Sequence, residues 1–252
     1  MGNVFSYVVS PKTNLMLSLK ETRKLAPNTY EFVFHNDQQL RFGPGQYMEW
    51  TLPHDGADSR GNRRFFTLSS SPTEREVKIG VKFHSRPSSF KRHLLNMKTD
   101  DRIAAGHLAG DFVLPKAKGE KIAFIAGGIG ITPFKSMVRY MLDTGDRRAA
   151  VVLYANRRIE DIAYDGLLEQ ASERLGIRTV HILTDPHLAP LGWDGRTGHI
   201  DEDLIREEVP DYRDRIFYVS GPPDMVAAAR RAIAGLGVKP NRIRTDYFPG
   251  FA

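Results

Sequence analysis

The chain has 252 residues, enough for one large domain or two of ordinary size, and its formal net charge is +6. Its sequence contains no Cys, which excludes disulfides, thiolate-held iron–sulfur clusters, Cys-based zinc sites and a catalytic thiol among these residues. No apolar run approaches the ~18 residues of a membrane span, and residues 1–10 lack a signal-peptide pattern, so we expect a cytoplasmic chain without a membrane span. The scattered basic residues carry no nucleic-acid-binding signature, and the eight His show no paired metal-ligand spacing. We therefore expect neither nucleic acid nor a metal ion as a ligand.

The first part of the chain has the pattern of a β-rich domain. Apolar and polar residues alternate in 15–19 and in 29–34, and strand-like runs follow at 46–52, 64–69 and 77–83. Turn signals separate these runs, and only 88–97 has a helical pattern. We expect a small antiparallel Greek-key barrel over residues 12–115.

After about residue 115 the pattern changes to strands alternating with helices. The expected strands are 121–126, 149–155, 178–183, 216–220 and 242–246, and the expected helices are 133–142, 162–175, 201–208 and 223–236. The first strand is almost continuously apolar, as in a strand buried on both faces. This order predicts a Rossmann-like α/β domain with a parallel sheet over residues 119–252.

A glycine-rich segment joins the first strand of this second part to its first helix. Gly127, Gly128 and Gly130 allow a sharp turn and a close backbone approach to a phosphate, and Thr132 and Pro133 suit the N-cap and first position of a helix. Free N–H groups at such a helix start form an anion site. The segment is not the G-x-G-x-x-G fingerprint, and a simple structural turn remains the alternative for it alone.

Two further segments carry groups that suit a cofactor. The run from Ser220 through Gly221 and Pro222 follows a late strand, at the edge where open parallel sheets bind ligands. In the barrel half, residues 63–72 combine arginines, two adjacent Phe and several hydroxyls in one strand. Arginine can clamp a phosphate, an aromatic ring can stack on a flat cofactor, and a hydroxyl can bond a ring nitrogen. An ordinary edge strand is the alternative.

Together these segments resemble the ferredoxin–NADP reductase superfamily, in which an FAD-binding barrel precedes an NAD(P)-binding α/β domain. Residues 64–67 match its flavin motif R-x-Y-[ST], except that Phe66 replaces Tyr, and residues 127–133 match G-G-x-G-x-T-P completely. Residues 106–112 resemble the G-P-x-G-x-F turn, Gly221 and Pro222 resemble C-G-P with Ser220 in place of Cys, and 243–248 match I-x-x-D-x-F. The resemblance extends over about residues 12–252, with the motifs in the family order.

The resemblance implies roles for individual residues. Arg64 would hold the flavin pyrophosphate, Phe66 would pack on the isoalloxazine, Thr67 would bond flavin N5, and Ser88 or Ser89 would meet the FAD phosphate. Gly128, Gly130 and Thr132 would cradle the dinucleotide pyrophosphate, and Phe248 or Phe251 would cover the flavin where nicotinamide enters. The implied catalytic residues are Thr67, Ser220, Asp246 and Phe248. The remaining implied cofactor contacts are Phe65, Leu68, Ser69, Lys82, His84, Phe90, Gly127, Pro133, Arg157, Arg158, Gly221 and Pro222.

The resemblance also implies the activity, a hydride transfer from NADH or NADPH to FAD followed by electron transfer to an external acceptor. The basic net charge favours an acidic carrier, ferredoxin or flavodoxin. The alternatives are a free flavin or ferric reductase, and an electron-transfer reductase module or subunit of a larger complex, whether membrane-associated or not. Arg157 and Arg158 favour NADPH, whereas Asp185 favours NADH, and we lean to NADH. FAD is preferred over FMN because Ser88 and Ser89 add a second phosphate-type segment to Arg64.

Overall fold

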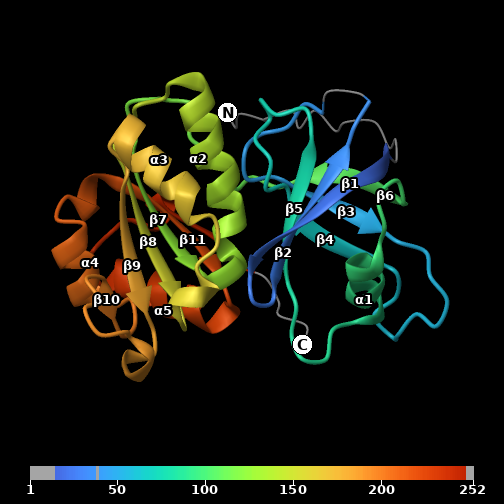
Figure 1. Cartoon of the computed structure of the whole chain (residues 1–252). Helices are drawn as coiled ribbons and strands as arrows, with labels where there is room; N and C mark the ends of the chain where they lie inside the picture. The colour runs from blue at the N-terminus through green and yellow to red at the C-terminus, as the bar shows by residue number, and fades with distance from the viewer. Residues whose placement is uncertain (1–14, 38–39, 248–252) are drawn as a thin grey trace.

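The computed structural model describes residues 15–37 and 40–247 and contains two six-stranded sheets, one after the other along the chain (Figure 1). The first sheet is antiparallel, and the second is parallel and flanked by helices on both faces. This arrangement confirms the predicted fold class. The strands are β1 (Leu15–Ala26), β2 (Thr29–His35), β3 (Tyr47–Thr51), β4 (Arg63–Thr67), β5 (Val77–Lys82), β6 (Arg102–Ala109), β7 (Lys121–Gly127), β8 (Ala150–Asn156), β9 (Arg178–Leu183), β10 (Arg196–Thr197), β11 (Arg215–Gly221) and β12 (Ile243–Tyr247). The helices are α1 (Ser89–Asn96), α2 (Thr132–Thr144), α3 (Asp165–Leu175), α4 (Glu202–Glu208) and α5 (Pro223–Gly235).

The antiparallel sheet closes into a barrel. Its strand order is β4-β3-β6-β1-β2-β5, and the two outer strands meet through an antiparallel bridge between Leu68 and Ile79. The amide of Ser69 also donates to the carbonyl of Lys78 at 2.8 Å. Closure leaves the outer strands without free edges. The interior is filled by large apolar side chains, all fully buried: Leu17, Phe32, Phe34, Trp50, Ile79 and Phe90.

Strand β6 occupies residues for which the sequence indicates only the turn-like segment 106–112. Its residues Arg102–Ala109 are rich in Ala and Gly, so they lack the β-branched and aromatic pattern typical of a strand. The strand forms because β1 and β3 pair with it on both sides. The chain turns at Gly110, which has φ 108°, and then crosses to the parallel sheet.

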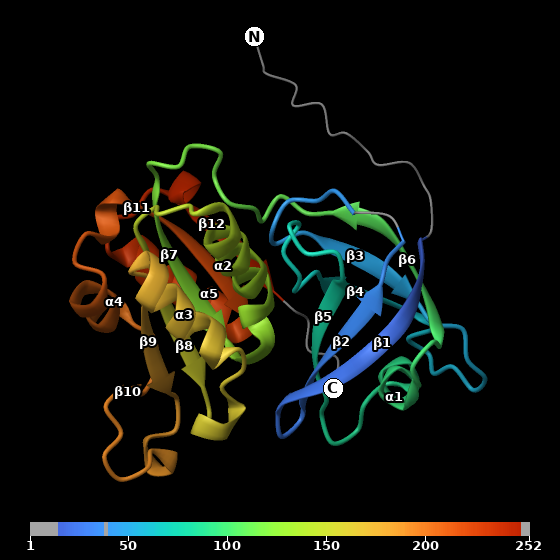
Figure 2. The ribbon, with the colours of Figure 1, turned by 45° about the horizontal axis from the view of Figure 1, so that its top comes forward.

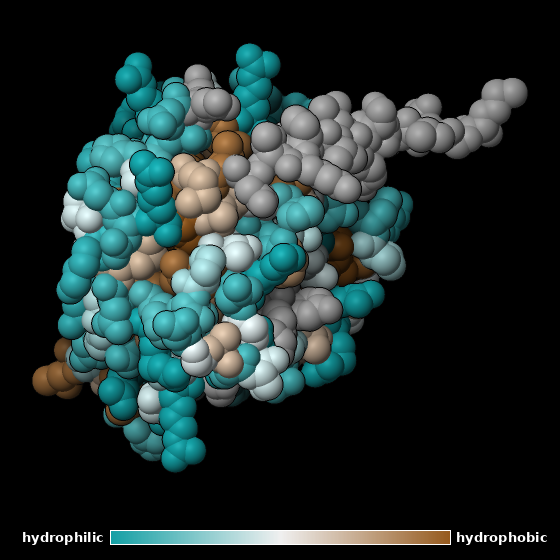
Figure 3. All heavy atoms as spheres, turned by 90° about the vertical axis from the view of Figure 1, so that its right-hand side faces the viewer, coloured by the Kyte–Doolittle hydropathy of each residue, from teal (hydrophilic) through white to brown (hydrophobic). Residues whose placement is uncertain are grey.

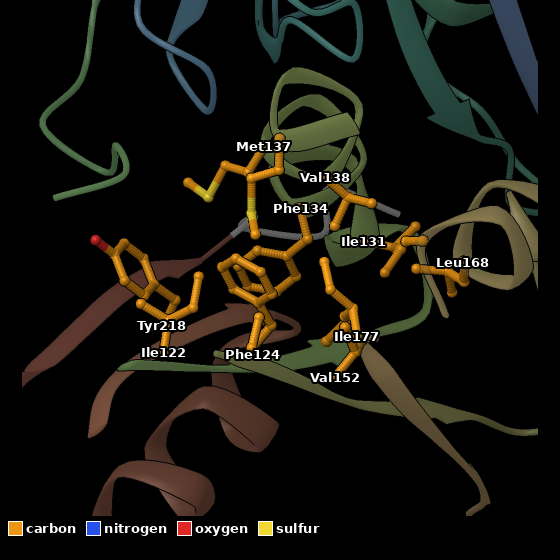
Figure 4. Close-up of a cluster of buried hydrophobic side chains, with 14 of the residues drawn as sticks. Ile122, Phe124, Ile131, Phe134, Met137, Val138, Val152, Leu168, Ile177 and Tyr218 are labelled. Carbon is orange, nitrogen blue, oxygen red and sulfur yellow. The ribbon is translucent and has the colours of Figure 1, made fainter. Parts of the chain in front are cut away.

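The parallel sheet has the order β10-β9-β8-β7-β11-β12, and apolar clusters cover both of its faces. Figures 1 and 2 show α2 and α3 on one face and α4 and α5 on the other. Under α2, Phe124 of β7 and Phe134 of α2 pack with their ring centroids 4.6 Å apart, in the centre of the cluster drawn in Figure 4. Both faces are buried, which explains the nearly continuous apolar sequence of β7.

Helix boundaries differ from the sequence expectation at two places. A 3₁₀ helix, Gly128–Ile131, precedes α2, so Thr132 is the first α-helical residue and not the N-cap. Its hydroxyl donates to the carbonyl of Ile129 at 3.0 Å. A second 3₁₀ helix, Ile159–Asp161, delays the start of α3 to Asp165. Patterns of apolar residues do not distinguish 3₁₀ from α turns over so few residues.

The barrel packs against helix α2, which lies beside β2 and β5 in both ribbon views (Figures 1 and 2). A Cβ on Gly45 would lie 2.5 Å from Met137 Cε of α2, so a glycine permits this close approach. On the side of the molecule drawn in Figure 3, the surface is mainly hydrophilic, and hydrophobic residues cover a smaller part of it. Among residues 15–37 and 40–247, no helix has the length and apolar character needed to cross a bilayer.

Candidate functional site

The glycine-rich segment after β7 lies against the end of β11. Strands β7 and β11 are parallel neighbours, with Ala126 opposite Ser220. A Cβ on Gly130 would lie 2.3 Å from the carbonyl oxygen of Ser220 and 2.6 Å from Gly221 Cα, distances that only glycine avoids. Gly128 has φ 52°, in the region that favours glycine. The structure therefore packs the two predicted dinucleotide segments against each other at the carboxyl ends of the strands, the edge where open parallel sheets bind ligands in a crevice. We call this place the glycine crevice.

Ser220 is a buried polar residue whose backbone packs against Gly130. Its side chain alternates with those of Phe217 and Val219 and shares a sheet face with Tyr218, the face under α2. The residue is fully buried, and its Oγ has no hydrogen-bond partner. A buried hydroxyl without a hydrogen-bond partner costs free energy. A bound ligand could supply the missing partner of Ser220 Oγ.

In the barrel half, alternate residues of β4 point to opposite faces. Arg64 and Phe66 lie on one face, where Phe66 and Phe90 have ring centroids 6.0 Å apart and the Arg64 guanidinium lies 5.4 Å from the Phe90 centroid. Phe65 points the other way and is 60% exposed, with its ring edge-on to Tyr47. The structure thus brings Arg64, Phe66 and Phe90 together and separates Phe65 from them.

Residues 53–62 bring an acidic group to Arg64. The amide of Ser89, at the start of α1, donates to Asp58 Oδ2 at 2.8 Å, and Arg60 Nη2 donates to the same oxygen at 3.0 Å. Arg64 Nη2 lies 3.8 Å from Asp58 Oδ1, but this buried nitrogen has no hydrogen-bond partner. The Ser89 amide and the Arg60 guanidinium hold the pKa of Asp58 well below its usual range. The carboxylate of Asp58 is thus an anion that the protein itself supplies, and it lies between the N-terminus of α1 and two arginines.

Lys91 adds a third cationic side chain to this cluster. Its Nζ donates to the carbonyl of Lys82 at 2.8 Å. Burial, together with the neighbouring Arg64 and Arg60, lowers the pKa of Lys91 to about 8. Such crowding of positive charge is typical of a site for a strongly anionic group. The sequence did not indicate a role for Asp58, Arg60 or Lys91. A local signal existed for Lys91 alone, which lies three residues after the N-cap Ser88 and so near the proposed phosphate site.

The predicted serines already have protein partners. Ser88 is the N-cap of α1, and its Oγ accepts from the Lys91 amide at 3.3 Å. Ser89 Oγ accepts from the Asp58 amide at 3.0 Å and hydrogen-bonds His54 Nε2 at 2.9 Å. The amides of Ser89 and Lys91 also have protein acceptors, so a phosphate at this helix start would meet the cationic side chains first.

The other predicted flavin contacts lie at the ends of β4 and β5. Thr67 and Ser69 are buried at the end of β4, and Leu68 between them faces the barrel core. Lys82 pairs with Asp161 of the second half at 3.6 Å. His84 is exposed, and its pKa is lowered by partial burial and by Lys91 and Lys82.

Groups that could recognise the ribose gather at the ends of β8 and β9. These strands are parallel neighbours, so Arg157 and Asp185 meet, with Arg157 Nη2 3.9 Å from Asp185 Oδ2. Arg158 follows Arg157 and is exposed. At the opposite edge of the sheet, Asp246 of β12 lies next to Ser220 of the neighbouring strand β11. Phe248 and Phe251 lie outside the described residues.

A cavity elsewhere in the second half contains none of these groups. Its volume is about 530 Å³, and Ile162, His181, Trp193 and Arg196 contribute to its wall beside the edge strands β9 and β10. No group of His, Asp and Glu with the arrangement of a metal site occurs in 15–37 or 40–247.

Known proteins are similar to this chain in sequence and in fold. Residues 124–231 match the family model described as the oxidoreductase NAD-binding domain. The chain is 27% identical over 221 residues to the glycine betaine monooxygenase reductase subunit of Pseudomonas aeruginosa, covering 86% of this chain and 59% of the relative. It is 30% identical over 235 residues to the stachydrine N-demethylase reductase subunit Stc4 of Rhizobium meliloti, covering 90% and 65%. The chain thus spans about three fifths of the length of these relatives.

Among solved structures, the Amycolatopsis cytochrome P450 reductase GcoB superposes with a TM-score of 0.82 at 26% identity. The match covers 96% of this chain and 72% of that protein. Both the barrel and the parallel sheet are therefore included in the likeness. The chain belongs to the ferredoxin–NADP reductase superfamily, with an FAD-binding barrel followed by an NAD(P)-binding α/β domain.

Proposed function

We propose that this chain is a reductase that uses NAD(P)H to reduce bound FAD and delivers the electrons to an acceptor outside the chain. The observation that carries the proposal is the presence of two phosphate-type sites, one in each half of the chain. One is the cation cluster around Arg64 in the barrel, and the other is the glycine crevice between Gly130 and Ser220. The proposal includes the division into domains 12–115 and 119–252 and a cytoplasmic location.

The residues of the barrel fit FAD. Arg64, with its unpartnered buried Nη2, would hold the pyrophosphate together with Arg60 and Lys91. Phe66 offers an apolar face to the ring system, although the hydroxyl of the usual Tyr is missing, and Thr67 offers a hydroxyl next to it. When bound, FAD supplies a hydride acceptor that can release its electrons singly.

The residues of the α/β half would orient the dinucleotide. Backbone N–H groups around Gly128 and Gly130 would receive its phosphates, and Ser220 Oγ would supply a hydrogen bond close to the nicotinamide. No proton transfer is required of a side chain, so the protein contributes mainly position and the exclusion of water. Asp246 and the predicted Phe248 or Phe251 complete this proposed site.

NADH is the proposed donor. Asp185 presents a carboxylate at the end of β9, which accepts hydrogen bonds from a ribose 2′-hydroxyl and repels a 2′-phosphate. Arg157 pairs with this carboxylate and is 69% exposed as a side chain, so its charge is partly neutralised. Stopped-flow reduction with each donor tests this, and a large preference for NADPH would contradict it.

The acceptor proposed is an acidic electron-carrier protein of the ferredoxin or flavodoxin kind. The net charge of +6 and the mainly hydrophilic barrel side in Figure 3 favour electrostatic steering of such a partner. The names of the two relatives, both reductase subunits, favour operation within a multicomponent system. Reduction of a ferredoxin should be faster than reduction of free FMN or ferric citrate and should slow with added salt.

The decisive experiment identifies the flavin and then reduces it. Heat-released flavin from the purified chain should chromatograph as FAD, and anaerobic NADH should bleach the bound flavin. Release of FMN would remove the FAD assignment. A preparation that binds no flavin even after incubation with FAD, or a flavin that neither dinucleotide bleaches, would overturn the proposed function.

A further inference from the structure

The interface between the barrel and α2 contains a buried charged cluster that the proposed chemistry does not use. Lys135 of α2 is only 7% exposed, and its Nζ lies 3.8 Å from Glu31 Oε1 of β2 and 3.6 Å from Glu74 Oε2. Glu31 is itself 4% exposed. The helix that begins at the phosphate loop thus places a cation inside the contact with the flavin-binding barrel.

The same cluster reaches the strand that carries Thr67. Ser69, two residues further along, donates from Oγ to Glu31 Oε1 at 3.1 Å. Ser70 is joined to α2 directly, because Ser136 Oγ donates to the Ser70 carbonyl at 2.6 Å. The end of the flavin strand is therefore connected to α2 at consecutive residues, once through Glu31 and once through the backbone.

Tyr164 closes the cluster from the second half. It has φ 62°, a left-handed conformation that a bulky residue adopts only when the surrounding structure requires it. Its ring lies 5.8 Å below Lys135 Nζ. A Cβ on Gly80, the β5 residue opposite Glu31, would lie 2.6 Å from Tyr164 Oη and 2.7 Å from Thr132 Cγ2. Glycine at this position lets both Tyr164 and the phosphate-loop Thr132 close on the barrel.

The buried charges of this cluster contribute more to the orientation of α2 against the barrel than to the net stability of the fold. Burial lowers the pKa of Lys135, while Glu31 and Glu74 oppose this effect. Burial likewise raises the pKa of Tyr164 well above its ordinary value. Buried ion pairs typically contribute little net stability compared with apolar side chains, but their directional contacts restrict the relative placement of the parts that carry them.

We propose that Glu31, Lys135 and Tyr164 are positioning residues that hold the phosphate loop and the flavin strand at the separation needed for hydride transfer. The inference rests on the proposed function for its chemical consequence. It does not rest on that function for its structural content, which is a fixed placement of α2 against the barrel.

Spin labels test the structural content directly. The chain has no Cys, so the pair Lys98→Cys and Glu173→Cys, at exposed sites on the barrel and on α3, can be labelled without background. Dipolar spectroscopy should give one narrow distance distribution in the otherwise unchanged chain. The double variant Glu31→Gln with Lys135→Met removes both charges together, so it avoids a buried unpaired ion, and it should broaden or shift the distribution.

Kinetics test the chemical consequence. In the double variant the rate constant of flavin reduction at saturating NADH should fall roughly tenfold or more, because small displacements of reacting groups are costly. The dissociation constants of FAD and NADH should change by less than about twofold, since no phosphate contact is removed. Tyr164→Phe, which keeps the ring under Lys135, should have a smaller effect of the same kind.

The matched control is Glu208→Gln. Glu208 is a 7% exposed carboxylate at the end of α4, between Arg178 of β9 and Arg196 of β10, and it lies within the second half. The Glu208→Gln variant should have a lower melting temperature, but its distance distribution and its rate of flavin reduction should be unchanged. An unaltered distribution in the Glu31/Lys135 double variant, or a slowing that Glu208→Gln reproduces, would overturn the inference. Failure of NADH to reduce the unaltered protein would instead overturn the proposed function, while the label distances still decide whether the cluster fixes α2 to the barrel.

Discussion

The two phosphate-type sites of this chain are built by different physical means. In the barrel, Arg60 and Arg64 lie beside Asp58 at the start of α1, and Lys91 is a charged neighbour of both arginines. In the α/β half, residues 127–133 contain no charged side chain, and the site consists of glycine backbone at the start of α2. Side-chain cations give strong, salt-sensitive attraction, whereas backbone dipoles give a weaker attraction that depends on close approach. The first suits a cofactor that stays bound, and the second suits a dinucleotide that leaves after each turnover.

The difference also determines how each site fails. The barrel site depends on charges, so it tolerates small changes of shape but not the loss of a cation. The glycine crevice depends on shape, so one added methyl group is more damaging there than any change of charge. The following variants and conditions separate these two kinds of failure.

The largest effect is expected from Gly130→Ala. The new Cβ would lie 2.3 Å from the backbone oxygen of Ser220, which cannot move without disturbing β11, so unfolding free energy should fall by about 3 kcal/mol. Urea denaturation and NADH titration measure the two consequences. Gly119→Ala is the control, because its Cβ would meet nothing within 4 Å. Equal stability of the two variants would show that the crevice is not closely packed.

Arg64→Ala should weaken FAD binding by about 2 kcal/mol, roughly 30-fold, because it removes a charge-assisted contact from a partly buried site. The matched control is Arg63→Ala on the outward face of the same strand, where the side chain is 65% exposed. Fluorescence titration of the flavin-free chain measures both. NADH affinity should be unchanged in each, and equal loss of FAD affinity in the two variants would contradict the assigned face.

Lys91→Met should separate stability from binding. The folded-state pKa of Lys91 is lowered to about 8, so the unfolded chain binds more protons between pH 8 and its ordinary value of 10.5. Stability of the flavin-free wild type should therefore rise with pH through this window, by about 1 kcal/mol relative to Lys91→Met after solvent screening. Below pH 8 the variant should be relatively more stable but bind FAD less tightly. Parallel pH profiles would contradict the buried charge.

The smallest effect is the response to salt. Raising the ionic strength from about 0.05 to about 0.5 M should weaken FAD binding by roughly threefold, because it screens the cations of the barrel site. The affinity of the glycine crevice for the dinucleotide should change less. Titrations at matched pH measure both, and a larger salt effect on the dinucleotide would reverse the comparison.

Local patterns were sufficient for the fold class and for most of the proposed site residues. The phosphate loop is contiguous, its glycines are required by local backbone geometry, and the period-2 pattern of β4 separates Arg64 and Phe66 from Phe65. Strand β6 was not predictable in the same way, because its Ala- and Gly-rich sequence becomes a strand only between β1 and β3. The three cations of the barrel site, Arg60, Arg64 and Lys91, come from a loop, a strand and a helix, whose approach has no sequence signature.

The sequence by itself determined the α-helices and most of the strands, where phosphates are expected and which residue types are available to receive them. These features follow from interactions between residues that are close along the chain. Only the tertiary structure decided that Gly130 touches Ser220, that Asp58 faces Arg64, and that Lys135 is buried against Glu31. The reason is that the burial of a charge and the fit of a crevice depend on partners far away in sequence. A lysine on an amphipathic helix is ordinarily exposed, and Lys135 is buried because the barrel supplies its carboxylates.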